Sequence, residues 1–252
     1  APSLVGSEMC IRDRINATGV TTITGSTFDI NTAYASGGIT GLGDENITLD
    51  TPTVVAFDLN ILDSNTVGTI NADIVTTIEG LASDINIAYA SDGISKTNLG
   101  TETVVLHDST VKASDLNLLN SNNTTGTIDA SFVTTITGSA IDINTAYFST
   151  GITGLGDENI TLDTPTVVAA DLNILDSNTA GTINADIVTT IEGLASDINA
   201  AYASDGISKT NLGSETVILT DSTVKASDLN LLDSNNTTGT INATGVTTIT
   251  GS

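Results

Sequence analysis

The sequence repeats itself with a period of 113 residues, and this repetition constrains the fold more than any other feature. The segment GITGLGDENITLDTPTVVA begins at Gly38 and begins again at Gly151. The segment INATGVTTITGS, residues 15–26, returns unchanged as residues 241–252, twice that distance further along. Weaker copies recur about every 57 and about every 28 residues. Units of this length are typical of solenoids, in which each unit packs only against its neighbours.

The clearest marker of the smallest unit is the tripeptide Asp-(Ile/Leu)-Asn. Its asparagines are Asn31, Asn60, Asn86, Asn117, Asn144, Asn173, Asn199 and Asn230. Asparagines on successive coils can form a ladder that satisfies backbone groups at the coil corners. We interpret the ladder as structural, because buried polar groups need hydrogen-bond partners. The aspartate of the tripeptide favours the N-terminus of a helix electrostatically.

One unit shows how a coil is built. Residues 127–130 and 133–137 are short and β-branched, which predicts two strands. Residues 139–149 then predict a short helix, because Ser139 and Asp142 have the spacing of a capping box. The alternate unit predicts strands at 159–162 and 166–169 and a helix at 170–178.

Neither kind of element is stable alone, because the helices have about three turns at most and isolated strand pairs are marginal. We therefore expect an α/β solenoid with about 28 residues per coil, each coil having two short strands, stacked in parallel, and one short helix. Stacked strands lie about 4.8 Å apart and packed helices about 8–10 Å apart. The array should therefore curve or twist, with the helices outside. The alternative is a β-solenoid in which the Asp-(Ile/Leu)-Asn segments are turns.

Residues 1–14 differ from the rest of the chain. They contain its one cysteine, its one methionine and both of its arginines. The stretch from Ser3 to Arg14 resembles the spurious peptide that results when sequencing-adapter DNA is translated in metagenome assemblies. We therefore treat 1–14 as non-native and 15–252 as a single tandem-repeat solenoid. No capping segment is recognisable at either end, so we expect a fragment of a longer array, truncated at both ends.

Composition argues against several classes of function. The net charge of −24 opposes binding to nucleic acid phosphates. No apolar run reaches the roughly 20 residues of a membrane span. The single histidine, His107, becomes Thr220 in the next copy, and no nucleophile is paired with a base. The sequence therefore predicts a protein that is not an enzyme and needs no cofactor, with calcium as the one ligand to consider.

The candidate calcium ligands lie in an acidic loop that occurs twice. They are Asp44, Glu45 and Asp50, and their copies Asp157, Glu158 and Asp163. Calcium takes six to eight oxygen ligands, and such a loop could supply several. The spacing matches neither an EF-hand nor the glycine-rich nonapeptide repeat. The simpler interpretation is a solvated acidic loop that keeps a repetitive surface soluble.

Thr-x-Thr motifs on predicted strands suggest a further, weaker hypothesis of ice or surface binding. They lie at 22–24, 135–137 and 248–250, and their threonine side chains would share one outer face. The intervening copies at 77–79 and 190–192 end in glutamate instead. A glutamate in alternate coils would interrupt a regular threonine array.

Two copied motifs resemble known repeats. VTTITGSAIDINTAYFSTGITGLGDENITL and TVKASDLNLLDSNNTTGTINA are similar to tandem repeats of very long secreted or cell-surface proteins of marine bacteria. The resemblance covers residues 15–252 and implies a non-enzymatic, adhesin-like or structural segment outside the cell, acting as a stalk or spacer. A calcium-binding repeat module is the alternative. The expected partners are neighbouring repeats of the same chain and, through exposed terminal edges, other copies end to end.

Overall fold

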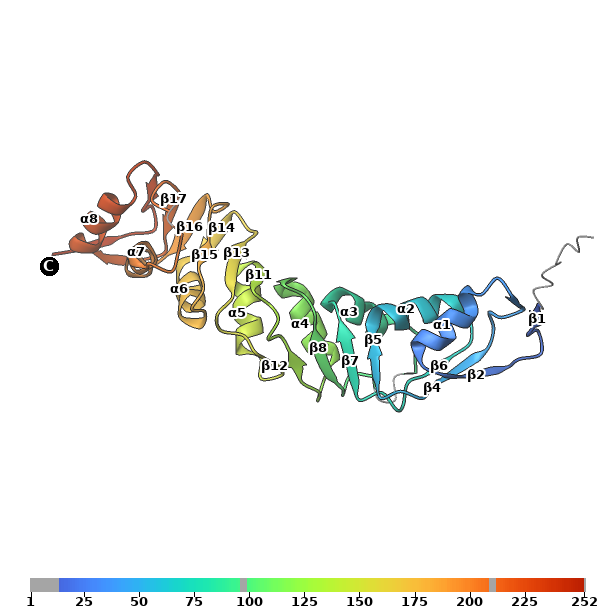
Figure 1. Cartoon of the computed structure of the whole chain (residues 1–252). Helices are drawn as coiled ribbons and strands as arrows, with labels where there is room; N and C mark the ends of the chain where they lie inside the picture. The colour runs from blue at the N-terminus through green and yellow to red at the C-terminus, as the bar shows by residue number, and fades with distance from the viewer. Residues whose placement is uncertain (1–13, 96–98, 209–211, 252) are drawn as a thin grey trace, which may run out of the picture.

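The computed structural model describes residues 14–95, 99–208 and 212–251. All but the last residue of the segment interpreted as non-native thus lie outside the described residues. The described chain forms an elongated, twisted rod in which short helices alternate with short strands (Figure 1). The helices are α1 (Thr27–Ala35), α2 (Ala56–Asn65), α3 (Ala82–Ala90), α4 (Ala113–Asn122), α5 (Ala140–Phe148), α6 (Ala169–Asn178), α7 (Ala195–Ala203) and α8 (Ala226–Asn235).

Two or three short strands precede each of these helices in the described chain. They are β1 (Ile15–Asn16), β2 (Thr22–Gly25), β3 (Ile39–Thr40), β4 (Asn46–Leu49), β5 (Thr53–Val55), β6 (Ile70–Asn71), β7 (Thr77–Gly80), β8 (Thr103–Leu106), β9 (Thr110–Lys112), β10 (Ile128–Asp129), β11 (Thr135–Gly138), β12 (Ile152–Thr153), β13 (Asn159–Leu162), β14 (Thr166–Val168), β15 (Ile183–Asn184), β16 (Thr190–Gly193), β17 (Thr216–Leu219), β18 (Thr223–Lys225), β19 (Ile241–Asn242) and β20 (Thr248–Thr250).

This architecture is the predicted α/β repeat solenoid, which is therefore confirmed. The β-solenoid alternative is wrong, because each Asp-(Ile/Leu)-Asn segment lies inside a helix. In α5 the Ser139 hydroxyl accepts a hydrogen bond from the Asp142 backbone N–H at 3.1 Å and donates one to the Asp142 carboxylate at 2.7 Å. The serine and aspartate spacing thus marks a real helix start.

Rows of isoleucine and valine form the core between the sheets and the helices. One row contains Val54, Ile78, Val104, Ile128 and Ile152, paired in parallel from strand to strand and all buried. The flanking residues of each strand face outward because side chains alternate along a strand. Each row passes through several coils, so no coil has a core of its own.

The helices complete this core with small and apolar residues spaced three apart. In α2 these are Ala56, Leu59 and Leu62, each fully buried. The strand before a helix ends in glycine in several coils, and Gly138 has a φ of +153°. A Cβ atom there would lie 3.1 Å from the Ala113 Cβ of the preceding coil. Glycine and alanine together let α4 approach the end of β11 closely.

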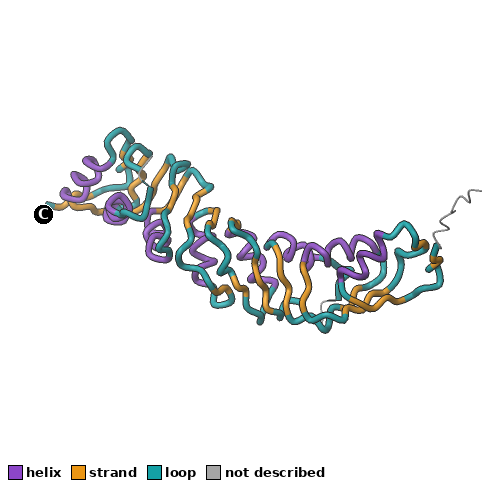
Figure 2. The backbone as a smooth tube through the Cα atoms, in the orientation of Figure 1, coloured by secondary structure: helices purple, strands orange, loops and turns teal. Residues whose placement is uncertain are grey.

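The strand ladder and the helix row advance by different numbers of residues. Paired strand residues lie 23 to 26 positions apart, as with Ile23 and Ile47, Ile160 and Ile183, and Ile78 and Val104. Helix markers recur every 26 to 31 residues. With each coil, the strand of a given ladder therefore ends further before the next helix along the chain, as in the ladder from β5 to β12. New sheets begin at β5, β9, β14 and β18, each directly before a helix. The row of helices winds around the rod (Figure 2).

Within the described chain, no helix is both long and apolar enough to cross a bilayer.

Candidate functional site

The acidic loops do not assemble the predicted calcium site. Glu45 is fully buried, and its carboxylate accepts hydrogen bonds of 2.8 Å from the Gly43 backbone N–H and 2.8 Å from the Tyr34 hydroxyl. Asp44 and Asp50 are exposed. The glutamate thus points into the rod while both aspartates face solvent.

The second loop repeats this arrangement. Glu158 is fully buried and accepts hydrogen bonds from Gly156 N–H at 2.9 Å and from the Tyr147 hydroxyl at 2.8 Å. Asp157 and Asp163 are again exposed. No group of three or more acidic, histidine or cysteine side chains able to hold a metal occurs among the described residues. The loops therefore bring inward one carboxylate each, already bound to protein donors.

The intervening 57-residue units carry an equivalent glutamate after Leu-Gly, which lies outside the predicted set of calcium ligands. Glu102 accepts from the backbone N–H groups of Gly100 and Thr101, and Glu215 accepts from Gly213 N–H at 2.7 Å. The signal was present in the sequence. Glu45, Glu102, Glu158 and Glu215 recur at intervals of 57, 56 and 57 residues, and each follows one of the four tyrosines by 11 or 13 residues.

Each buried glutamate also links its coil to the next one through its backbone carbonyl. The Thr66 hydroxyl donates to the Glu45 carbonyl at 2.7 Å, and Asn123 donates its side-chain amide to the Glu102 carbonyl at 3.0 Å. Gly68, two residues after Thr66, lies against the same Glu45 carbonyl and has no room for a Cβ atom. The glutamate loop is therefore a junction between coils.

Burial and hydrogen bonding balance differently at Glu45 and at Glu102. At Glu45, burial raises the pKa, but hydrogen bonds from Gly43 N–H, from its own N–H and from Tyr34 outweigh burial and lower the pKa. At Glu102, burial prevails over the backbone hydrogen bonds and raises the pKa. Burial, with the neighbouring Glu45, raises the pKa of Tyr34 to about 12. Among the described residues, the hydroxyl of Tyr89 and one carboxylate oxygen each of Glu45, Glu102 and Glu215 are buried without a hydrogen-bond partner.

The asparagines form a ladder between helices, not at the coil corners where we expected it. All eight lie inside helices, and seven of them donate the side-chain amide to the backbone carbonyl of the aspartate in the next helix, at 2.8–3.0 Å. The donors are Asn31, Asn60, Asn86, Asn117, Asn144, Asn173 and Asn199. Asn230 lies in α8, which has no following helix in the described chain. The corner prediction failed because the helical phase of the asparagine could not be fixed without knowing where each helix begins.

The outward faces of the strands carry two rows of side chains, and only the first is rich in threonine. In that row Thr53, Thr77 and Thr103 pair in turn, as do Thr166, Thr190 and Thr216. The second row is mixed. In the row through β9, β11, β13 and β15, Lys112 pairs with Thr137, Thr137 with Thr161 and Thr161 with Asn184. Glu79 occupies the equivalent place in β7, paired with valines on both sides. The face mixes charged, amide, hydroxyl and apolar groups.

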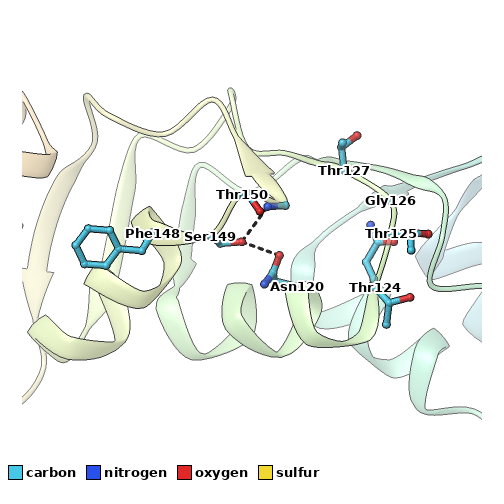
Figure 3. Close-up of a pocket in the computed structure, with 10 residues that line it drawn as sticks. Asn120, Thr124, Thr125, Gly126, Thr127, Phe148, Ser149 and Thr150 are labelled. Carbon is cyan, nitrogen blue, oxygen red and sulfur yellow. Dashed lines mark hydrogen bonds between the residues drawn. The ribbon is translucent and has the colours of Figure 1, made fainter.

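A polar cleft of about 500 Å³ opens between the loop that follows α4 and the loop that follows α5 (Figure 3). Its lining is Asn120, Asn123, Thr124, Thr125, Gly126, Thr127, Phe148, Ser149, Thr150 and Gly151. Ser149 joins the two sides by donating to the Asn120 side-chain oxygen at 2.8 Å. Within its own loop it also accepts from the Gly151 N–H at 3.1 Å. The ring of Phe148 points away from the cleft (Figure 3).

Comparison with known proteins gives no relative: no family model, no curated protein and no solved structure matches the chain.

Proposed function

We propose that this chain is a non-enzymatic spacer, a stalk-like segment of a large extracellular surface protein. The observation that supports this proposal is the single apolar core, which runs from Ile30 in α1 to Leu232 in α8 without a break. Helices pack in chain order, each against the next, so a further coil lengthens the rod without changing its cross-section.

The coil junctions make such a rod resistant to bending. Every interface combines core rows, an asparagine bond between helices and, in alternate coils, a glutamate junction. The net charge of −24 keeps the long surface soluble and opposes collapse of one rod onto another. Length, stiffness and mutual repulsion are what a spacer at a cell surface requires.

The test of the spacer role is a length measurement. A variant in which residues 27–139 are duplicated gains four coils in register with the repeat. With stacked strands about 4.8 Å apart and packed helices about 8–10 Å apart, the four added coils should lengthen the rod by about 19–40 Å. Small-angle X-ray scattering should show a longer maximum dimension with an unchanged cross-sectional radius. A thicker particle of unchanged length would contradict the proposal.

The surface location needs a separate test. Antibodies raised against the purified chain should label intact cells of the source organism, and protease added outside the cells should remove the signal. Labelling that requires permeabilised cells would contradict the extracellular assignment while leaving the spacer geometry untouched.

A further inference from the structure

We propose that the cleft between the α4 and α5 loops binds a neutral saccharide. Its volume of about 500 Å³ falls within the roughly 300–1,000 Å³ of small-molecule sites. The side chains that line it are hydroxyls and amides, with one phenylalanine whose ring points elsewhere. Among the residues that the structure describes, no charged side chain lines the cleft, although the chain as a whole carries a net charge of −24.

The cleft owes this neutrality to departures from the repeat. Asn120 stands where the other copies of the unit have Asp63, Asp176 and Asp233. Thr150 stands where two other copies have Asp92 and Asp205. Elsewhere the equivalent aspartate accepts the same serine hydroxyl, as Asp63 does from Ser91 at 2.8 Å. The link between coils is therefore kept in the cleft while the negative charge is absent.

The loop on the opposite side adds hydroxyl groups. After α2 the chain passes through Thr66, Val67 and Gly68, whereas after α4 it passes through residues 123–126, Asn-Thr-Thr-Gly. This loop is one residue longer and replaces an exposed valine with threonines. Gly126 lies against the Glu102 carbonyl, which fixes the loop in place.

These groups select the chemistry of a ligand. Hydroxyls and amides both donate and accept hydrogen bonds, which suits the hydroxyls of a sugar. Asn120 uses its side-chain oxygen for Ser149, and within the described chain its NH₂ group makes no hydrogen bond, so it remains a donor. A cation would find no carboxylate in the cleft, and an anion would be repelled by the rod as a whole. A neutral polyhydroxylated ligand satisfies both conditions.

Affinity should be modest. A hydrogen bond to the ligand replaces one to water, so its net contribution to affinity is small, and in the described part of the chain no aromatic ring faces the cleft to stack on a sugar. A dissociation constant near the millimolar range is therefore expected, about −4 kcal/mol. Many copies along one rod would raise the avidity of a surface protein for a polysaccharide.

The experiment uses the full chain and saturation-transfer difference NMR. Neutral probes are cellotriose and maltotriose, and charged probes are tri-galacturonic acid and chitotriose with free amines. We expect saturation transfer to at least one neutral probe and to neither charged one. Absence of transfer to both neutral probes, or transfer to the charged probes alone, would overturn the proposal.

The decisive variant is Asn120→Asp with Thr150→Asp, which installs the residues that the chain itself carries at 63 and 92 and at 176 and 205. The fold should therefore tolerate both changes, and neutral-saccharide binding should fall at least tenfold. Thr125→Val, which removes one hydroxyl without adding charge, should weaken binding several-fold and covers the case in which the double variant is unstable. Phe57→Ala, at an exposed position outside the cleft where the next copy has Ala170, should leave binding unchanged. Undiminished binding in both cleft variants would place the sugar elsewhere and overturn the assignment.

Discussion

Replacing Asn144 by alanine tests whether the asparagine ladder holds the helices together. The Asn144 side chain is 5% exposed. It donates to the Asp171 carbonyl at 2.8 Å and accepts from the Asn178 side chain at 3.2 Å. The substitution removes both hydrogen bonds and leaves the Asn178 amide without this partner.

The expected cost follows from these contacts. The bond to the carbonyl is worth about 1 kcal/mol, and the longer bond from Asn178 with its partial desolvation contributes about as much again. We therefore expect a loss of about 2 kcal/mol in unfolding free energy. For a chain of this size, that corresponds to a drop of roughly 4–8 °C in melting temperature.

Asn230 supplies a matched control within the same protein. It occupies the same place in α8, is exposed, and forms no hydrogen bond in the described part of the chain. Asn230→Ala should therefore change the melting temperature little. Alanine also favours helices by a few tenths of a kcal/mol, and this gain is common to both variants and cancels in the comparison.

Differential scanning calorimetry of the two variants measures the difference, and hydrogen exchange locates it. Because coils interact mainly with their neighbours, Asn144→Ala should lower protection first at the α5–α6 junction. A double-mutant cycle with Asn178→Ala should give a coupling energy of at least about 0.5 kcal/mol. Equal melting temperatures for Asn144→Ala and Asn230→Ala would show that the ladder contributes nothing to coil cohesion.

Three further predictions concern the glutamate junctions and the acidic loops. Glu45→Gln should lower the free energy of unfolding by about 1–3 kcal/mol at pH 7, because a charged acceptor of backbone and tyrosine hydrogen bonds is lost. Glu102→Gln should lower it less, because burial already disfavours the charged form of Glu102. The two carboxylates contribute to the free energy of unfolding with opposite pH dependence. The Glu45 contribution is present above the ordinary pKa of 4.5 and is lost as pH falls, whereas the Glu102 contribution is present below 4.5 and is lost as pH rises. Urea titrations from pH 3 to 7 should therefore separate the two variants. Gly181→Ala should destabilise the fold by roughly 1–3 kcal/mol, because its Cβ would clash with the Glu158 carbonyl. Gly37→Ala has open space around the new Cβ and should be neutral or slightly stabilising. Similar chemical-denaturation midpoints for the two variants would contradict this packing. Calcium or a chelator should leave the melting temperature unchanged, because the exposed aspartates do not converge with the buried glutamates, and a rise with calcium would restore the acidic loops as a binding site.

The repeat period and the β-branched runs were sufficient to predict the coil. Residues 159–162 were expected as a strand and are β13, and the expected helix 139–149 is α5, shorter by one residue at each end. Local propensity decides these elements, so the sequence alone reveals them. The ends of such segments were the least certain part, as the shift of Ala169 from strand to helix shows.

The candidate site was harder to predict, because burial depends on partners from other coils. Glu45 and Asp44 are adjacent acids, and nothing local distinguishes the one that turns inward. The distinction comes from Tyr34, which supplies a donor inside the rod, and from Gly43, whose N–H faces the carboxylate. The cleft at Asn120 was likewise invisible until the two loops that form it were placed side by side.

The different steps of strands and helices explain how both can stack in one rod. Strands pair about 4.8 Å apart, too close for helices that need roughly 8–10 Å. Because a coil is about four residues longer than the ladder step, equivalent positions also shift along the strands by roughly 13 Å per coil, at about 3.3 Å per residue. Equivalent points on neighbouring coils are therefore separated by more than the strand spacing. As a result, each ladder eventually leaves the helix row and a new sheet must begin, as at β9 and β14.

A coil shortened to the ladder step would lose this shift, and its helices would be forced closer together than their side chains allow. The length of the repeat unit is thus set by helix packing as much as by the strands.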